Sequence, residues 1–314
     1  MKSIVFIVPY FGKLPNYFKL WLESCRYNPT IDFLLFIDDK TEYNYPSNVK
    51  VNYISFNELK DIIQTHYDFK IVLPKPYKLC DFRPAFGEIF EKYITNYDYW
   101  GYCDIDLIWG DMRKFVTDDI LLKHKRIFTH GHCTIMENSK EVNAYYRKLP
   151  TFDILNYKSE FQTPLSKCFD ERNINEVGGT VNIFIKNNIP MYDESTMFDI
   201  NFKKGYFISY LRDDNGKNQF YKYYKGKLYQ ISSYGEVEGM YAHFQKRNLI
   251  IDDDLNFNEY YLIAPYYVSS RFNKIKKYIL QKKLFELRFL KNKFVSHFKR
   301  EKLKKKIERG DYHE

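Results

Sequence analysis

The sequence has 314 residues, of which 45% are hydrophobic and 19% aromatic, with 30 tyrosines and 27 phenylalanines. This length and composition support a sizeable folded core and exclude a disordered chain or an alanine- and leucine-rich coiled coil. The net charge is +9, but residues 271–310 alone contain 16 basic and three acidic residues, so the rest of the chain is close to neutral. An anionic partner is therefore expected at the C-terminal segment.

The five cysteines are widely spaced and contain no C-x-x-C pair, so neither a disulfide framework nor a zinc cluster is indicated. A reducing cytoplasm is the expected compartment. The apolar run at residues 4–8 is too short for a signal sequence, and no uncharged stretch is long enough to cross a membrane. We expect a protein that is neither secreted by a signal peptide nor membrane-spanning.

The first third of the chain alternates strand and helix patterns. We predict strands at 3–8, 33–37 and 49–54 and helices at 14–25 and 56–66. Ser55 and Glu58 have the spacing of a capping box that opens the second helix. Continuous apolar strands separated by helices indicate a doubly wound α/β fold, a mostly parallel sheet covered on both faces. Because such sheets bind ligands at the carboxyl ends of their strands, residues 9–12 and Asp38 are candidates for a ligand crevice.

Strand and helix patterns continue through the rest of the chain. We predict strands at 99–103 and 126–130 and helices at 84–96, 117–125 and 139–148. We also predict an apolar helix that follows Gly178-Gly179 and ends at Asn187-Asn188, and a hairpin at 219–232. Asn138, with Glu141 three residues on, is expected to cap the 139–148 helix. No linker rich in Ser, Gly or Pro interrupts the sequence. We therefore predict one α/β domain over residues 1–265 and a basic helical extension over residues 266–314.

The segment that carries the clearest chemical signal is Asp104-Ile-Asp106, at the end of the aromatic strand 99–103. Side chains two residues apart in an extended backbone point to the same side, so both carboxylates can reach one point. Such hard oxygen ligands suit Mg²⁺ or Mn²⁺. The alternative is a solvated turn in which Asp104 caps the next element.

The order of the elements, with an acidic residue after the second strand and a D-x-D near residue 100, resembles the GT-A class of nucleotide-sugar glycosyltransferases. Five short segments further resemble a bacterial family associated with capsule and cell-surface polysaccharide synthesis: 75–84 (KPYKLCDFRP), 101–107 (GYCDIDL), 128–132 (FTHGH), 169–171 (FDE) and 243–247 (HFQKR). The resemblance covers about residues 1–250. It implies a single GT-A domain with a mostly parallel mixed sheet, with residues 1–110 as the nucleotide-sugar half and 111–265 as the acceptor half.

The resemblance implies a divalent metal, Mn²⁺ or Mg²⁺, that bridges the two phosphates of the donor and neutralises charge on the leaving diphosphate. Asp106 would be a metal ligand, and Asp104 would share the metal or reach the ribose. His243 and Lys246 match the late histidine ligand and phosphate-binding residue of retaining lipooligosaccharide galactosyltransferases. The alternative for His243 is a packed strand histidine.

Further donor contacts follow from the same resemblance, with UDP as the default nucleotide. Tyr10 and Phe11 after the first strand, and Asp38 after the second, would contact uracil and ribose. Four charged residues lie just before a predicted helix, where cations and backbone donors can bind a diphosphate or ribose: Lys75, Lys78, Asp81 and Arg83. Their alternative is an exposed charged loop.

For the acceptor half, Asp170, Glu171 and Glu176 are the candidate catalytic carboxylates. A carboxylate base is required only by an inverting enzyme, and the resemblance favours a retaining one. Each of the three acids has an equally plain alternative as a helix cap or surface residue. His130 and His132 are candidates for contacts with acceptor hydroxyls, or belong to an ordinary turn. The expected acceptor is a saccharide or a lipid-linked saccharide.

Residues 271–309 repeat apolar residues among lysines, a basic amphipathic pattern that favours an anionic membrane surface. The protein would then be cytoplasmic and peripheral on the inner face of the cytoplasmic membrane, close to a lipid-linked acceptor. The alternatives are a helix packed on the domain and a dimer contact.

Three other functions remain open. A nucleotide-sugar nucleotidyltransferase or pyrophosphatase would normally have a glycine-rich phosphate loop after the first strand, and Pro9-Tyr10-Phe11-Gly12 is not one. A nucleic-acid-binding protein is suggested by the basic tail, but no recognised module accompanies it, so no nucleic acid is expected. A catalytically inactive carbohydrate-binding protein would have no need of the D-x-D.

Overall fold

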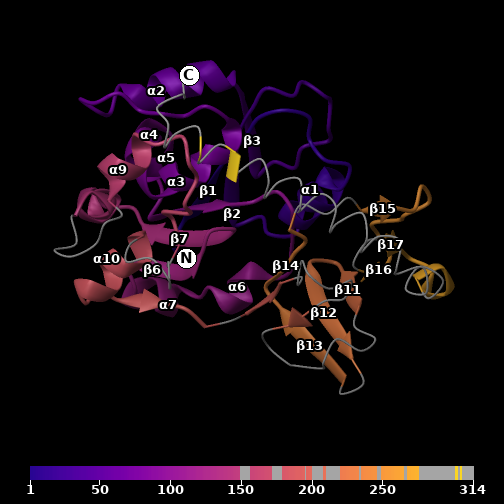
Figure 1. Cartoon of the computed structure of the whole chain (residues 1–314). Helices are drawn as coiled ribbons and strands as arrows, with labels where there is room; N and C mark the ends of the chain where they lie inside the picture. The colour runs from indigo at the N-terminus through magenta and orange to yellow at the C-terminus, as the bar shows by residue number, and fades with distance from the viewer. Residues whose placement is uncertain are drawn as a thin grey trace. The chain divides into compact units, whose positions relative to one another are not determined.

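The computed structural model describes residues 1–148, 156–171, 179–194, 196–199, 208–209, 220–232, 235–245, 249–264, 267–275, 301–302 and 305. The chain forms two units (Figure 1). The first comprises Met1–Ile105 and Met112–Glu194, and the second comprises Asp106–Asp111 and Ser195–Glu314. No helix among the described residues is both long enough and apolar enough to cross a membrane.

The first unit is built on a seven-stranded mixed sheet in the order β3-β2-β1-β4-β7-β6-β8. Its strands are β1 (Ile4–Tyr10), β2 (Ile31–Ile37), β3 (Val49–Tyr53), β4 (Tyr99–Cys103), β6 (Arg126–His130), β7 (Cys133–Glu137) and β8 (Met191–Tyr192). Strands β1 to β4 pair in parallel, whereas β7 is antiparallel to both β4 and β6. The predicted α/β class and the parallel first half of the sheet are confirmed. Strand β7, which the sequence analysis did not predict, makes the sheet mixed.

Both faces of this sheet are covered, as the apolar strands predicted. Val5 and Ile7 of β1 belong to one large buried cluster with residues of α2 (Phe56–Gln64), while Phe6 points the opposite way. Phe6 stacks on Phe33 of β2 with ring centroids 5.5 Å apart, and Trp21 of α1 (Phe18–Arg26) packs edge-on against Phe33 at 5.3 Å. Helices α1 and α2 therefore cover opposite faces.

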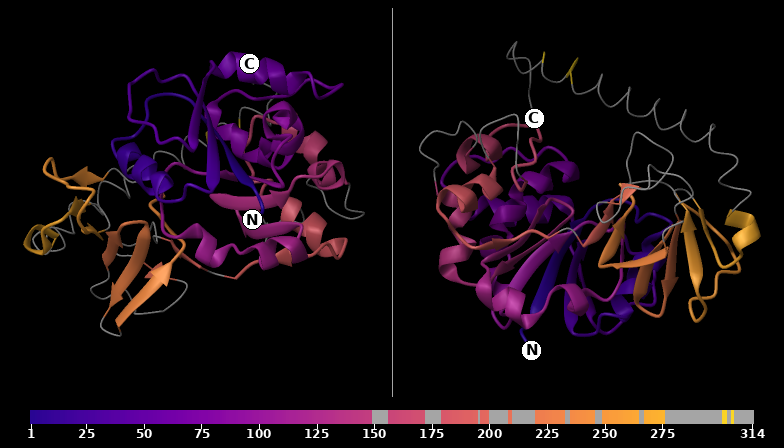
Figure 2. Two further views of the ribbon diagram at one scale, coloured as in Figure 1. Left: turned by 180° about the vertical axis from the view of Figure 1, so that it is seen from behind. Right: turned by 90° about the horizontal axis from the view of Figure 1, so that it is seen from below.

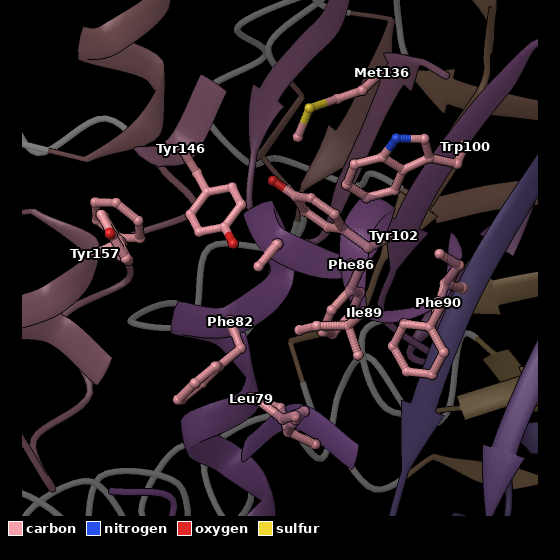
Figure 3. Packing of buried hydrophobic residues seen from close by; sticks show 14 of the residues in the cluster. Leu79, Phe82, Phe86, Ile89, Phe90, Trp100, Tyr102, Met136, Tyr146 and Tyr157 are labelled. Atoms are coloured by element: carbon pink, nitrogen blue, oxygen red, sulfur yellow. The ribbon is translucent and has the colours of Figure 1, made fainter. Parts of the chain in front are cut away.

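Helix α2 begins where the sequence predicts, because Ser55 and Glu58 form the expected reciprocal capping box. The predicted helix 84–96 is instead divided into η2 (Arg83–Ala85), α4 (Phe86–Ile89) and α5 (Glu91–Ile94), preceded by η1 (Pro76–Lys78) and α3 (Leu79–Phe82). Pro84 has no N–H to donate, which explains the break between α3 and η2. Phe82 of α3, Phe86 of α4 and Phe90, which lies between α4 and α5, fill the core (Figure 3).

The remaining helices of the first unit are short: α6 (Met112–Phe115), α7 (Asp118–Lys123), α8 (Lys140–Asn143), η3 (Tyr145–Arg147), α9 (Tyr157–Phe161) and α10 (Thr180–Lys186). Helices α7 and α10 match predictions. The helix predicted at 139–148 is wrong in its length and in its cap, because Ser139, not Asn138, accepts the hydrogen bond from the Val142 N–H. The Asn138 amide instead donates to the carbonyls of Ile94 and Tyr97.

The second unit contains two sheets. A four-stranded sheet has the order β10-β9-β14-β5, from β10 (Ile208–Ser209), β9 (Met197–Asp199), β14 (Tyr241–His243) and β5 (Leu107–Trp109). A six-stranded sheet has the order β13-β12-β11-β16-β17-β15, from β13 (Gly235–Gly239), β12 (Lys227–Ser232), β11 (Phe220–Tyr224), β16 (Tyr261–Ala264), β17 (Tyr267–Ser269) and β15 (Ile250–Ile251). The predicted hairpin is confirmed as β11 and β12, drawn in orange in Figure 2. Most of the predicted basic extension lies outside the described residues, which end in this region with a helical turn at 272–275 and with residues 301, 302 and 305.

Candidate active site

Asp106 and His243 are brought together by strand pairing within the second unit. Asp106 directly precedes β5, and His243 ends the neighbouring antiparallel strand β14, in register with Leu107. The Phe244 N–H donates to the Asp106 carbonyl at 2.9 Å, which extends the ladder past the end of β14. Asp106 Oδ1 consequently lies 3.6 Å from His243 Nε2. Both side chains are buried.

His243 has a second carboxylate neighbour on its other nitrogen. Asp199 ends β9, which pairs in parallel with β14 so that Asp199 is in register with His243. Asp199 Oδ1 lies 3.0 Å from His243 Nδ1. Asp199 is not among the site residues predicted from the sequence. In the local sequence it is only an acidic residue that follows two apolar ones. Its contact with His243, which indicates a role at the site, joins residues 44 positions apart.

Asp104 is joined to Asp106 through the single residue Ile105, so the two carboxylates belong to one short stretch of chain. The Asp104 N–H donates to the His132 carbonyl at 3.0 Å, which continues the β4–β7 ladder and fixes the backbone at the motif. One ligand atom from each of Asp104, Asp106 and His243 lies within 4.8 Å of the others. Two carboxylates and one imidazole form a donor set that fits Mn²⁺, and its oxygens also suit Mg²⁺.

Arg83, on η2, contacts three acceptors within the first unit. One nitrogen of its guanidinium donates to Asp104 Oδ1, and the other donates to the Gly131 carbonyl at 2.6 Å and to Asp170 Oδ2 at 3.1 Å. The guanidinium also lies 5.5 Å from the centre of the Tyr102 ring. Burial lowers the pKa of Arg83, but the carboxylates of Asp104 and Asp170 more than offset this effect and raise it well above its usual value.

Asp170 and Glu171 lie against the turn between β6 and β7. Burial raises the pKa of Asp170 to about 7, and the negative charges of Glu171 and Asp81 add to this rise, whereas the contact with Arg83 opposes it. Glu171 Oε1 accepts from the Gly131 N–H at 2.8 Å. A side chain at Gly131 would place its Cβ 2.4 Å from that oxygen, so the carboxylate of Glu171 would have to shift to admit it. Glu176 lies outside the described residues, as does Lys246.

Lys78 and Asp81 are fully buried and hold part of the first unit together. Lys78 Nζ donates to Asp81 Oδ2 at 2.7 Å and to the carbonyls of Glu160 and Leu165 at 2.8 and 2.6 Å. Asp81 Oδ1 accepts from the Phe169 N–H at 2.8 Å. These contacts account for both residues as supports of the chain leading to Asp170, and their predicted contact with a donor stays a prediction.

The predicted nucleotide contacts meet at the carboxyl ends of β1 and β2. Asp38 Oδ1 accepts from the Gly12 N–H at 2.7 Å, and Gly12 adopts φ +95°, which glycine allows without strain. Tyr10 ends β1, and Phe11 packs on Phe56 with ring centroids 5.3 Å apart. Tyr10, Phe11 and Asp38 therefore lie at one edge of the sheet, as predicted.

The two histidines of the β6–β7 turn stack on each other. The rings of His130 and His132 lie 5.2 Å apart and are inclined by 10°. Asp193 accepts from the Thr129 N–H at 3.1 Å and lies 4.0 Å from His130 Nε2.

A protein-family model matches residues 6–271, and its description is "Family of unknown function (DUF6625)". The chain belongs to the DUF6625 family. The predicted membership of a capsule polysaccharide family stays a prediction. No curated protein matches this DUF6625 sequence.

Solved glycosyltransferase structures show a distant likeness to this DUF6625 chain. The galactosyltransferase LgtC, in complex with donor and acceptor sugar analogues, is 10% identical over 62% of this chain and 75% of its own, with a TM-score of 0.37. Mouse xyloside xylosyltransferase 1 is 9% identical over 63% and 88%, with a TM-score of 0.35. A glycosyltransferase involved in glycosylation of the major capsid of PBCV-1 is 8% identical over 78% and 93%, with a TM-score of 0.38. Likeness at this level carries no inference about activity, so the function has to be inferred from the chain's own residues.

The DUF6625 chain also contains a buried cation that the sequence analysis did not single out. Arg126 of β6 is fully buried and donates to the Phe128 carbonyl at 3.0 Å and to the Asp170 carbonyl at 2.8 Å. It also donates to the hydroxyl of Thr180 at 3.2 Å. In the sequence it reads as the polar first residue of a strand, and nothing local predicts its burial.

Proposed function

We propose that this chain is a metal-dependent glycosyltransferase that moves a sugar from a nucleotide-sugar donor, with UDP as the expected nucleotide, to a saccharide or lipid-linked saccharide. The observation that carries the proposal is the grouping of Asp104, Asp106 and His243 at strand ends. Oxygen-rich ligand sets of this kind hold Mg²⁺ or Mn²⁺ ions that complete their coordination with substrate phosphates.

Asp106 and His243 would hold the metal, and Asp104 would share it. Mn²⁺ or Mg²⁺ in this place would supply positive charge that stabilises a departing nucleoside diphosphate. A hard divalent ion beside a diphosphate is common to glycosyl and nucleotidyl transfer, so the choice between them rests on the resemblance of the D-x-D context to GT-A enzymes.

Arg83 would add a second positive group for the donor. Its guanidinium is held between Asp104 and Asp170 and has the fork geometry that binds phosphate oxygens in pairs. At the carboxyl ends of β1 and β2, Tyr10 and Phe11 would contact the base and Asp38 the ribose.

For the acceptor side, we propose Asp170 and Glu171 as groups that orient the acceptor hydroxyl. A carboxyl whose pKa is about 7 is only partly ionised at neutral pH, and its ionised form is a stronger base than an ordinary carboxylate. We propose a retaining reaction on the resemblance alone; in such a reaction the leaving phosphate can accept the proton, and Asp170 would only orient the hydroxyl.

We further propose, on the resemblance alone, that the reaction belongs to cell-surface polysaccharide synthesis at the inner face of the cytoplasmic membrane. Residues 271–310 would attach the protein to anionic lipid. Loss of liposome binding by a chain ending at residue 270 would support this attachment, and unchanged binding would contradict it.

The deciding experiment is a thermal-shift panel of UDP, GDP, CMP and dTDP, each with Mn²⁺ or with EDTA. A nucleotide that binds the native state stabilises it by about 2.7 kcal/mol at a hundredfold excess over its dissociation constant. We expect UDP to raise the melting temperature with Mn²⁺ and not with EDTA. D106N should lose the shift, and D193N should keep it because Asp193 is an exposed carboxylate that contacts His130 and Thr129.

Two outcomes would contradict the proposal. No shift with any nucleotide would argue against a nucleotide-sugar donor. Hydrolysis of the donor without an acceptor, at the rate of transfer, would favour a pyrophosphatase or nucleotidyltransferase.

A further inference from the structure

The imidazole of His243 lies between two carboxylates of the second unit. Its Nε2 faces Asp106 Oδ1 at 3.6 Å, and its Nδ1 faces Asp199 Oδ1 at 3.0 Å. Only the second distance is that of a hydrogen bond. In a neutral imidazole one nitrogen bears the proton and the other a lone pair, so a hydrogen bond at Nδ1 decides which nitrogen can bind a metal.

Asp199 is itself held in place from a second direction. The Gln245 side-chain amide donates to both oxygens of Asp199, at 3.0 and 3.1 Å. Gln245 reaches this position from the bend that follows β14, where its backbone adopts φ +49°. The parallel pairing of β9 with β14 sets the register of Asp199 against His243. The acceptor at Nδ1 is thus fixed by both backbone pairing and a side-chain contact.

We infer that Asp199 is a positioning residue for the metal centre, which accepts the Nδ1–H of His243 and leaves the Nε2 lone pair directed to the metal. The inference rests on the proposed function, because it assigns a role toward the same metal. Asp199 is not a ligand itself, since it lies on the nitrogen opposite Asp106. Carboxylates that orient a metal-binding histidine fix its tautomer and make its metal-binding nitrogen a stronger ligand.

A purely structural role for Asp199 would be to join β9 to β14. That role predicts a loss of stability and no specific effect on the ring of His243 or on metal affinity. The two roles can therefore be separated by measurements other than enzyme activity.

The first measurement is the tautomer of His243 in the full chain, read from the ¹⁵N shifts of labelled histidine in EDTA at a pH where the ring is neutral. We expect the proton on Nδ1 in the wild type. Because this measurement uses the unaltered protein, it stands even if a variant fails to fold. A proton on Nε2 would overturn the inference.

The second measurement is Mn²⁺ affinity, from the electron paramagnetic resonance signal of free Mn²⁺, in wild type, D199N, D106N and D193N. D199N keeps the size of the side chain but removes its charge. It also replaces one acceptor oxygen with an NH2 group, which would face the donating amide of Gln245. We expect it to weaken Mn²⁺ binding about 10- to 100-fold, as loss of such a partner typically does. D193N makes the same change beside His130 and should bind Mn²⁺ as the wild type does.

The outcomes separate this inference from the proposed function. Wild-type affinity in D199N, with weak binding in D106N, would overturn the role of Asp199 and leave the metal site intact. Failure of the wild-type chain to bind Mn²⁺ would overturn the metal site and the inference with it.

Discussion

Two buried groups of charged residues in this chain differ in how their charges are balanced. In the first unit, Lys78 and Asp81 form a fully buried pair, and the remaining Lys78 contacts are backbone carbonyls. In the second unit, His243 lies between Asp106 and Asp199, so two carboxylates share one imidazole. A balanced pair can serve the fold alone, whereas an oxygen-rich group with imidazole suits a divalent cation. The contrast indicates which buried charges support the fold and which support chemistry.

The largest effect on stability is expected from K78M, which would leave the Asp81 carboxylate buried without its cation. Breaking a buried pair from one side typically costs about 3–5 kcal/mol. Urea titration should show this loss in the free energy of unfolding, and Mn²⁺ should bind the folded fraction unchanged. The double variant K78M/D81N removes the stranded charge and should recover part of the loss. A cost for K78M as small as that of an ordinary surface substitution would contradict a supporting role for the pair.

D106N is expected to change stability little and to reduce turnover strongly, which is the opposite of the expectation for K78M. Asparagine has nearly the same size, and the backbone carbonyl of residue 106 still accepts from Phe244, so the free energy of unfolding should change by no more than about 1 kcal/mol. Metal-dependent turnover should fall by on the order of 100-fold, since one group that stabilises the developing charge would be lost. The check is sugar transfer with and without Mn²⁺. Full activity of D106N with Mn²⁺ would show that Asp106 is not a ligand.

The Lys78 pair and the His243 group also illustrate which features could be predicted from the sequence: those that depend on neighbouring residues, and not those that depend on tertiary contacts. Local periodicity predicted β1, β2 and the capping box of α2, and alternation along an extended chain placed Asp104 and Asp106 together. Tertiary pairing decided the rest. From the sequence, Lys78 and Asp81 could belong to an exposed charged loop. The carbonyls that accept from Lys78 in the folded chain belong to residues 160 and 165, more than 80 positions away in the sequence. Asp199 acquires a role only through its pairing with β14. Ser139 caps the helix because Asn138 Oδ1 already accepts from the Asn143 amide, while the Asn138 amide donates to two distant carbonyls.

The Arg83 group lies between these two extremes, because one guanidinium serves both Asp104 and Asp170. Burial raises the pKa of Asp170 from its ordinary value of 3.8 to about 7. Between these values the folded chain binds more protons than the unfolded chain, so this group's contribution to stability falls as the pH rises from about 4 to 7. The slope from one such group is at most about 1.4 kcal/mol per pH unit.

D170N should remove this slope, since an amide does not titrate. We expect urea titrations across that range to show that the unfolding free energy of the wild type falls relative to that of D170N as the pH rises. D193N, an exposed carboxylate in the same unit, is the control and should follow the wild type. Parallel pH curves for D170N and wild type would mean that Arg83 keeps Asp170 ionised throughout. Asp170 and Arg83 would then form a balanced pair like Lys78 and Asp81, and Asp170 would not be partly protonated at neutral pH.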